Sequence, residues 1–280
     1  TSTFPGRPDA GLETQSGASV VDASWSGNRP LGYYAPPGMP VAITVPATWL
    51  DRGLSIQVGE RYDDLRNLNH IDTWYRAPMM LRTFEVTSET TQVTHTFGGA
   101  LYLVVPQDNT GTIDVEISGA YPMTVYTQGS STDADWNSVQ NIGVPQTILQ
   151  ELGHIRLVVE TAAAQTVTDP ASVVDFWSQF HSHHIELAQE PQTRRYESHW
   201  IFDAQVGWGY ANATDRRITY PKLSEVWALR TQTGNEDWWL FGHELGHQFQ
   251  TSDWTSGDVT EVCVNLFTMY TLNKYIHGGG

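Results

Sequence analysis

Hydrophobic and polar residues alternate in short runs between about residues 30 and 170. The runs are rich in Val, Ile, Thr and Tyr, and Gly, Pro, Asn and Asp separate them, which is the pattern of strands joined by turns. The runs are Val41–Val45, Leu54–Val58, Leu81–Val86, Thr91–Phe97, Ala100–Val105, Thr112–Ile117 and His154–Glu160. This rhythm predicts an antiparallel β-sandwich or a jelly roll. Residues 1–29 are rich in Ser, Gly and Asp, and we expect them to be extended or poorly packed.

The pattern changes near residue 170. Asp169 and Pro170 are residues that begin helices, and a long helix is predicted over residues 173–188. Two further helices are predicted over 236–250, beginning near Asn235–Asp237, and over 258–275. The sequence therefore predicts an α+β fold, in which a β-sandwich-like or jelly-roll-like region is followed by a mainly helical one. We expect an extended segment at 1–29, the sandwich at 30–135 and the helical region at 136–280, with the boundary inside 125–170.

Composition narrows the classes of partner. The chain has 280 residues, 31 Asp and Glu against 15 Lys and Arg, and a formal net charge of −16. Such a chain repels nucleic acid and anionic membrane surfaces, so neither is an expected partner. It also repels densely sialylated or sulfated glycans unless a local patch offsets the field. Hydrophobic residues make up 40% of the chain, which is enough for a substantial core and argues against disorder.

Segments that would target or anchor the chain are not apparent. No apolar run approaches the ~20 residues that span a bilayer, and no basic segment followed by an apolar one opens the chain. We expect Thr1 to be an internal start, the C-terminal end to be truncated, and the full-length protein to carry further domains. Cys263 is the one cysteine, so no internal disulfide forms, and we expect this thiol to pack in the core.

Residues 243–247 have the sequence His-Glu-Leu-Gly-His. A helix advances about 100° per residue, so His243 and His247 point from one helix face at a single metal ion, with Glu244 beside them. This is the arrangement of zinc metallopeptidases, in which the Glu acts as general base on a water. Gly242 and Gly246 lower helix propensity but leave room for a metal, a substrate or a second helix.

A catalytic zinc needs a third protein ligand and an open position. Glu261 lies in the first turn of the next predicted helix, and we take it as the third ligand. Asp258 is the competing ligand, and in another interpretation Glu261 only caps the helix together with Asp258. Asn265, one turn after Glu261, is expected to support a ligand by hydrogen bonding.

These residues carry a resemblance to a known family. His243-Glu-Leu-Gly-His247-Gln-Phe-Gln250, then Trp254 and the run Thr260–Tyr270, resemble the M60-like, enhancin-type zinc metallopeptidases. Further similar segments are Gly32–Gly38 with Val41–Val45, Phe97–Leu103, Pro122–Trp136 and Tyr220–Pro221. Two positions depart from the pattern: Gly257 lies four residues before Glu261 instead of three, and Thr219 replaces a Gly. The first keeps the Asp258 alternative open, and the second puts a role for Tyr220 in doubt.

The resemblance implies a zincin-type catalytic region at 136–280 whose zinc is held by His243, His247 and Glu261. It also implies a secreted or cell-surface endopeptidase that cuts mucin-type O-glycosylated proteins. Trp208, Tyr210 and Tyr220 precede the metal helix, and we expect them to line the cleft, with one of the two Tyr donating to the oxyanion. The competing interpretation is that these three are core or turn residues.

Two other groups of residues allow a second interpretation. Trp49, Trp74 and Tyr75 would suit glycan binding by the sandwich, but we favour packing in its core. His181 and His184 share a helix face and would suit an extra metal site, but we favour a solvated helix end that carries protonated histidines.

Two alternatives to the peptidase remain open from the sequence. One is a glycan- or mucin-binding adhesin on the same scaffold with little or no hydrolytic activity. The other is a structural zinc domain, which would close the metal's coordination sphere with four protein ligands.

Overall fold

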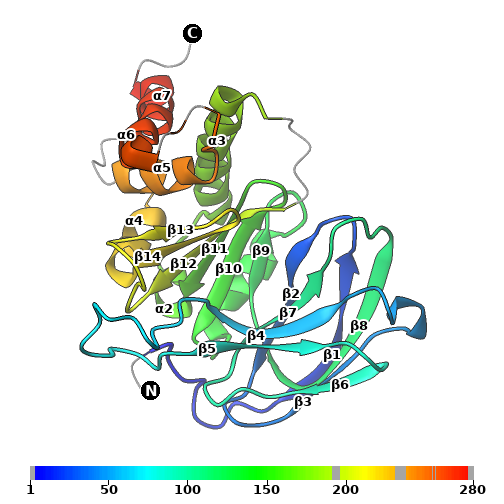
Figure 1. The fold of residues 1–280 in the computed structure, drawn as a ribbon. Coiled ribbons are helices and arrows are strands. Elements are labelled where there is room, and N and C mark those ends of the chain that lie inside the picture. Colours follow the sequence, from blue (N-terminus) through cyan, green and yellow to red (C-terminus); the bar gives the residue numbers. More distant parts are fainter. Residues whose placement is uncertain (1–3, 191–195, 231–237, 254, 256, 277–280) are drawn as a thin grey trace. The chain divides into compact units, whose positions relative to one another are not determined.

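The computed structural model describes residues 4–190, 196–230, 238–253, 255 and 257–276 (Figure 1). It confirms a mixed fold of helices and antiparallel strands. The chain divides into two units by its internal contacts. One comprises Thr1–Tyr126, Ser130–Ile148 and Val159–Thr166, and the other comprises Thr127–Gly129, Leu149–Val158 and Val167–Gly280.

The first unit is built on eight strands, which pair antiparallel wherever their register is defined. They are β1 (Gln15–Asp22), β2 (Gly27–Ala35), β3 (Val41–Thr44), β4 (Ser55–Arg61), β5 (Met80–Glu85), β6 (Thr90–Val93), β7 (Gly99–Val105) and β8 (Thr112–Pro122). Their order is β5-β4-β7-β2-β8-β3-β6, and β1 pairs with β8. β8 joins β1 and β3 along most of its length and reaches β2 only at its end, near Tyr121. The unit also holds the short helices η1 (Ala47–Trp49), α1 (Asp133–Asn137), η2 (Ser138–Asn141) and α2 (Thr161–Ala164).

Alternation along β8 shows why this region folds as a sandwich. Ile113, Val115 and Ile117 are buried while Asp114 and Glu116 between them are exposed, which is the period of a strand with one face on a core. Side chains from β1, β2, β3, β4, β6, β7 and β8 meet in one hydrophobic cluster. All six strands predicted within the first unit are present, although β6 ends at Val93 instead of Phe97.

Two expectations for this unit differ from the structure. Residues 15–22 form strand β1, which pairs along β8, yet Val21 is the only one of its side chains that is buried. Backbone pairing holds this strand, so it carries little hydrophobic signal. The second expectation is that Trp49, Trp74 and Tyr75 pack in the core. It is wrong for Trp74 and Tyr75, which are 55% and 72% exposed, whereas Trp49 packs against the core cluster.

A second sheet has the strand order β13-β14-β12-β11-β10-β9. Its strands are β9 (Val125–Thr127), β10 (Gln146–Glu151), β11 (Ile155–Glu160), β12 (Ser198–Asp203), β13 (Asn212–Ala213) and β14 (Arg217–Pro221). β12 is parallel to both β11 and β14. Only β11 was expected from the sequence. All six residues of β12 are buried, so this strand shows none of the polar alternation that reveals a half-exposed one.

The helices of the second unit lie together on one side of its sheet (Figure 1). They are α3 (Pro170–Ala188), α5 (Trp238–His247), α6 (Thr260–Cys263) and α7 (Asn265–Ile276), with the short η3 (Lys222–Ser224), α4 (Glu225–Ala228) and η4 (Gly257–Val259). The start of α3 is confirmed, because the Asp169 side chain accepts from the Ser172 N–H. The expected helix start at Asn235–Asp237 and the residue Trp254 lie outside the described residues.

The helix expected over 258–275 is divided into η4, α6 and α7. Val264, Phe267, Thr268 and Thr271 are buried, whereas the apolar Val262 and Leu266 are 66% and 57% exposed. Cys263 is half-buried instead of fully packed in the core. Among the described residues, no helix has both the length and the apolar character needed to cross a membrane.

The two histidines of α3 correct another expectation. His181 and His184 are fully buried, so they do not form a solvated helix end. His184 lies between three helices: its Nε2 is 3.1 Å from the Gly242 carbonyl of α5, and its Nδ1 is 3.1 Å from the Thr271 hydroxyl of α7. Burial lowers the pKa of His184 to about 4, so the ring is neutral near pH 7 and packs as part of the core.

Candidate metal centre

Helix α5 presents the two histidines on its half-exposed side. Phe241 and Leu245 are buried and fix the opposite side of the helix against the core. His243 and His247 stand one turn apart with ring centroids 4.9 Å apart, and both side chains remain partly open to solvent. The spacing of four residues therefore places both rings at one position, as predicted from the sequence.

Glu261, on α6, meets both rings. Its Oε2 lies 2.9 Å from His243 Nε2 and 3.5 Å from His247 Nε2. These three side chains form the only group among the described residues whose ligand atoms are close enough to share a metal ion, all within 4.8 Å of one another. Asp258 and Cys263 are not part of it, and neither are His181 and His184.

The distances from Glu261 Oε2 to the two imidazole nitrogens fit a shared zinc ion. Ligands that bind one zinc tetrahedrally at about 2.0–2.1 Å lie roughly 3.3 Å from one another, between the two distances observed here. The Glu261 side chain is 75% exposed, so the group is open on one side. Three protein ligands with an open side are typical of a catalytic site, whereas a structural zinc site is closed by a fourth.

Asn265 fixes the tautomer of His243. Its amide nitrogen donates to the Glu261 backbone carbonyl at 2.9 Å, so its Oδ1 faces His243 Nδ1, also at 2.9 Å. A carbonyl oxygen only accepts, so Nδ1 carries a proton, and in the neutral imidazole Nε2 then keeps a lone pair for a metal. The structure thus places Asn265 where the sequence predicted a supporting residue.

Gln250 does the same for His247. Its amide nitrogen donates to the Thr260 carbonyl at 2.7 Å, and its Oε1 accepts from His247 Nδ1 at 2.7 Å. This residue was quoted in the sequence pattern but was given no role there. Its position three residues after His247 is the only sequence signal, and its orientation depends on a carbonyl of α6 that the sequence does not place.

Glu244 points to the buried side of the same helix and is 8% exposed. Burial raises the pKa of its carboxyl group, and the neighbouring His247 and His243 oppose that rise. A carboxylate with a raised pKa is a stronger base than an ordinary Glu, which suits the transfer of a proton near neutral pH.

The three aromatic residues expected to line the cleft differ in their exposure. Trp208 and Tyr210 are 58% and 59% exposed on the loop before β13, so they are available to a ligand. Tyr220 is fully buried on β14, and its hydroxyl donates to the Phe241 carbonyl at 3.4 Å. Burial and the nearby Glu244 carboxylate raise the pKa of Tyr220 well above its ordinary value, so it remains a neutral phenol beneath the metal helix.

Gly242 and Gly246 allow the helices to approach closely. A Cβ at Gly246 would lie 2.7 Å from the Val264 Cγ2, and a Cβ at Gly242 would lie 3.0 Å from the Thr268 Cγ2. The glycines therefore make room for the helix that follows Glu261, which is one of the roles the sequence allowed. This contact brings the Glu261 carboxylate to the two imidazoles.

Two family models match most of the chain, including the residues of this site. The model of the family described as peptidase M60, enhancin and enhancin-like matches residues 119–278. The model of the N-terminal domain of M60-like peptidases matches residues 12–118. The chain belongs to the peptidase M60 family. The resemblance inferred from the sequence is thereby confirmed.

Relatives of this M60 domain are both animal and bacterial. A TRPM8 channel-associated factor homolog from Xenopus laevis is 29% identical over 92% of this chain and 29% of its own length. A functionally unknown conserved protein from Bacillus anthracis has the same fold, with a TM-score of 0.75 and 19% identity over 94% of this chain and 56% of that one. An M60 catalytic domain of Clostridium perfringens ZmpC, solved with the sialyl T antigen, gives a TM-score of 0.67 and 14% identity over 90% of this chain and 56% of that one. The chain spans about three-tenths of the length of the first curated relatives.

Proposed function

We propose that this domain is a zinc endopeptidase and that His243, His247 and Glu261 hold the metal. The observation that carries the proposal is the meeting of two Nε2 atoms and one carboxylate oxygen within 4.8 Å on an open side of the molecule. Each of the Asn265 and Gln250 amides accepts from an Nδ1–H, so in the neutral imidazoles both Nε2 atoms keep a lone pair for a metal.

The chain's own residues divide the work of hydrolysis. A zinc ion at this site would supply a Lewis acid that polarises a peptide carbonyl and makes water easier to deprotonate. Glu244 takes the proton from the attacking water on its carboxylate and passes it to the leaving amine nitrogen. Its buried position keeps the carboxylate poorly solvated and basic.

We propose mucin-type O-glycosylated proteins as the substrates and a secreted or cell-surface location. The family membership and the capture of an M60 domain with the sialyl T antigen support this class of substrate. Trp208 and Tyr210 are exposed on the loop before β13, and aromatic faces of this kind suit the apolar faces of sugars.

The test compares an O-glycosylated peptide with its unglycosylated twin, and mass spectrometry locates the cut. We expect zinc-dependent cleavage of the glycopeptide, inhibition by a chelator, and a loss of about 10²–10⁴-fold in kcat for Glu244→Gln with zinc content unchanged. Glu151→Gln, which alters a half-buried carboxylate outside the site, is the control and should behave as the wild type. Normal turnover by Glu244→Gln would refute the assigned base.

A second candidate function is binding without hydrolysis, as an adhesin-type module on the M60 scaffold. The observation that favours it is the name of the curated relatives, which are TRPM8 channel-associated factors. Retention on a mucin column by zinc-loaded protein, with no cleavage of any O-glycopeptide, would support this candidate over the peptidase.

A further inference from the structure

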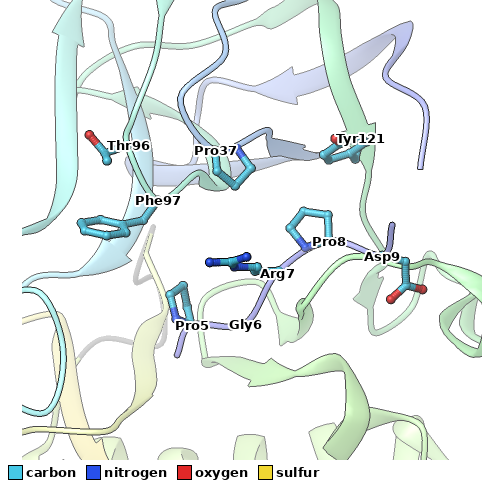
Figure 2. Close-up of a pocket in the computed structure, with 9 residues that line it drawn as sticks. All are labelled: Pro5, Gly6, Arg7, Pro8, Asp9, Pro37, Thr96, Phe97 and Tyr121. Carbon is cyan, nitrogen blue, oxygen red and sulfur yellow. The ribbon is translucent and has the colours of Figure 1, made fainter. Parts of the chain in front are cut away.

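A hollow of about 420 Å³ opens in the first unit, and the metal centre contributes no residue to it. The N-terminal segment 5–9 forms one wall, and the rest comes from the turn after β2, the loop before β7 and the end of β8 (Figure 2). Its lining residues are Pro5, Gly6, Arg7, Pro8, Asp9, Pro37, Thr96, Phe97 and Tyr121. Segment 5–9 lies outside both ranges that the family models match.

The wall that carries Arg7 is held at both ends. Phe4 is buried under the Arg61 guanidinium, 5.1 Å from its ring centroid, and the Asp9 N–H donates to the Gly143 carbonyl at 2.8 Å. Gly6 lies so close to Pro145 that a Cβ there would stand 2.7 Å from the proline ring. Arg7 is therefore presented from a fixed backbone, which reduces the entropy lost when it binds a ligand.

The Arg7 guanidinium is the cation of this hollow. Figure 2 shows its side chain extended between Phe97 and Pro8, while the Asp9 carboxylate points away from it. Among the described residues, it makes no hydrogen bond or ion pair with another side chain. In a chain with a net charge of −16, such a cation offsets the repulsive field locally and attracts an anionic group. The fork of a guanidinium matches a carboxylate or a sulfate.

The remaining lining favours a sugar over a peptide. Pro5, Pro8 and Pro37 have no N–H, so this wall offers few donors to an extended peptide backbone. Phe97 and Tyr121 supply aromatic surface, and the Thr96 hydroxyl both donates and accepts. A volume near 420 Å³ is at the lower end of small-ligand sites and suits one or two sugar rings.

We propose that this hollow binds an anionic sugar, with Arg7 pairing with its carboxylate or sulfate and with Phe97 or Tyr121 against its apolar face. The hollow shares no residue with the metal centre. The proposal does not depend on the metal centre and holds whether or not the domain is a peptidase.

The test measures binding of sialyllactose, sulfated lactose and uncharged lactose to the whole chain by titration calorimetry, with a chelator present so that zinc is not required. We expect at least one charged sugar to bind about tenfold or more tightly than lactose, and Arg7→Ala to remove that difference. Arg7→Lys should retain part of it. Arg52→Ala, which removes an exposed arginine of the same unit outside the hollow, is the matched control and should bind as the wild type.

Each outcome decides the question. Binding of either charged sugar through Arg7 supports the proposal, and which of the two binds identifies carboxylate or sulfate as the anion. Equal binding by Arg7→Ala and the wild type overturns it. So does Arg7-dependent binding of an acidic peptide when neither charged sugar binds. Thermal unfolding of Arg7→Ala at the wild-type temperature excludes loss of the fold as the cause of its lost binding.

Discussion

At the scale of single residues, two side-chain amides define the chemistry of the metal centre. Asn265 and Gln250 each donate to a backbone carbonyl of α6 and accept from an imidazole of α5. Two backbone carbonyls of α6 therefore orient the amides that hold the Nδ1 atoms of both imidazoles on α5. The i, i+4 spacing of the histidines is local and could be predicted, whereas the Gln250 contact depends on where the Thr260 carbonyl lies in space.

His184 links the pH dependence of stability to the same group of helices. Its pKa is about 4 in the folded chain and 6.5 as an ordinary value, so between these pH values the unfolded chain binds a proton that the folded chain does not. The contribution of His184 to the free energy of unfolding is therefore greatest above pH 6.5. It falls by about 3 kcal/mol as the pH drops towards 4.

Chemical denaturation between pH 4 and 7 measures this effect. His184→Gln should be less stable at pH 7 but should lose less stability on acidification than the wild type. His183→Gln alters the half-exposed neighbour and should keep the wild-type slope. An identical slope for His184→Gln and the wild type would show that His184 is not the buried neutral histidine described here.

At the scale of elements, the close approach of α5 to α6 and α7 positions Glu261. Gly246→Ala would place a Cβ 2.7 Å from the Val264 Cγ2, and we expect a loss of ~1–3 kcal/mol in the free energy of unfolding together with weaker zinc binding. Gly257→Ala is the control, because a Cβ there meets nothing within 4 Å. Denaturation curves and zinc titrations of both variants check this. A neutral effect of Gly246→Ala would mean that the helices do not pack as described.

Element prediction succeeded where burial is one-sided and failed where it is not. β8 could be recognised because Ile113, Val115 and Ile117 alternate with exposed residues. β12 is buried on both faces, so its sequence has no alternation to find. The stretch 258–275 has a helical period, but its exposed Val262 and Leu266 show that periodicity alone does not say which face is buried. Contacts far apart in the sequence decide that.

At the scale of the whole molecule, a net charge of −16 controls the approach of charged substrates. Salt screens this field, since the Debye length falls to about 10 Å at 0.1 M. If sialylated glycopeptides are substrates, their kcat/KM should rise with ionic strength, whereas that of the desialylated peptide should change little. Steady-state kinetics over a salt series compare the two peptides. A rate for the sialylated peptide that falls with salt would point to a positive field at the cleft.

The zinc content of the protein tests the central claim most directly. Metal analysis and competitive titration should find one zinc ion per chain, with affinity strongly reduced in Glu261→Gln and unchanged in Asp258→Asn. This result would place His243, His247 and Glu261 around a single ion. Zinc binding that survives Glu261→Gln but is lost in Asp258→Asn, or a chain that binds no zinc at all, would contradict the account.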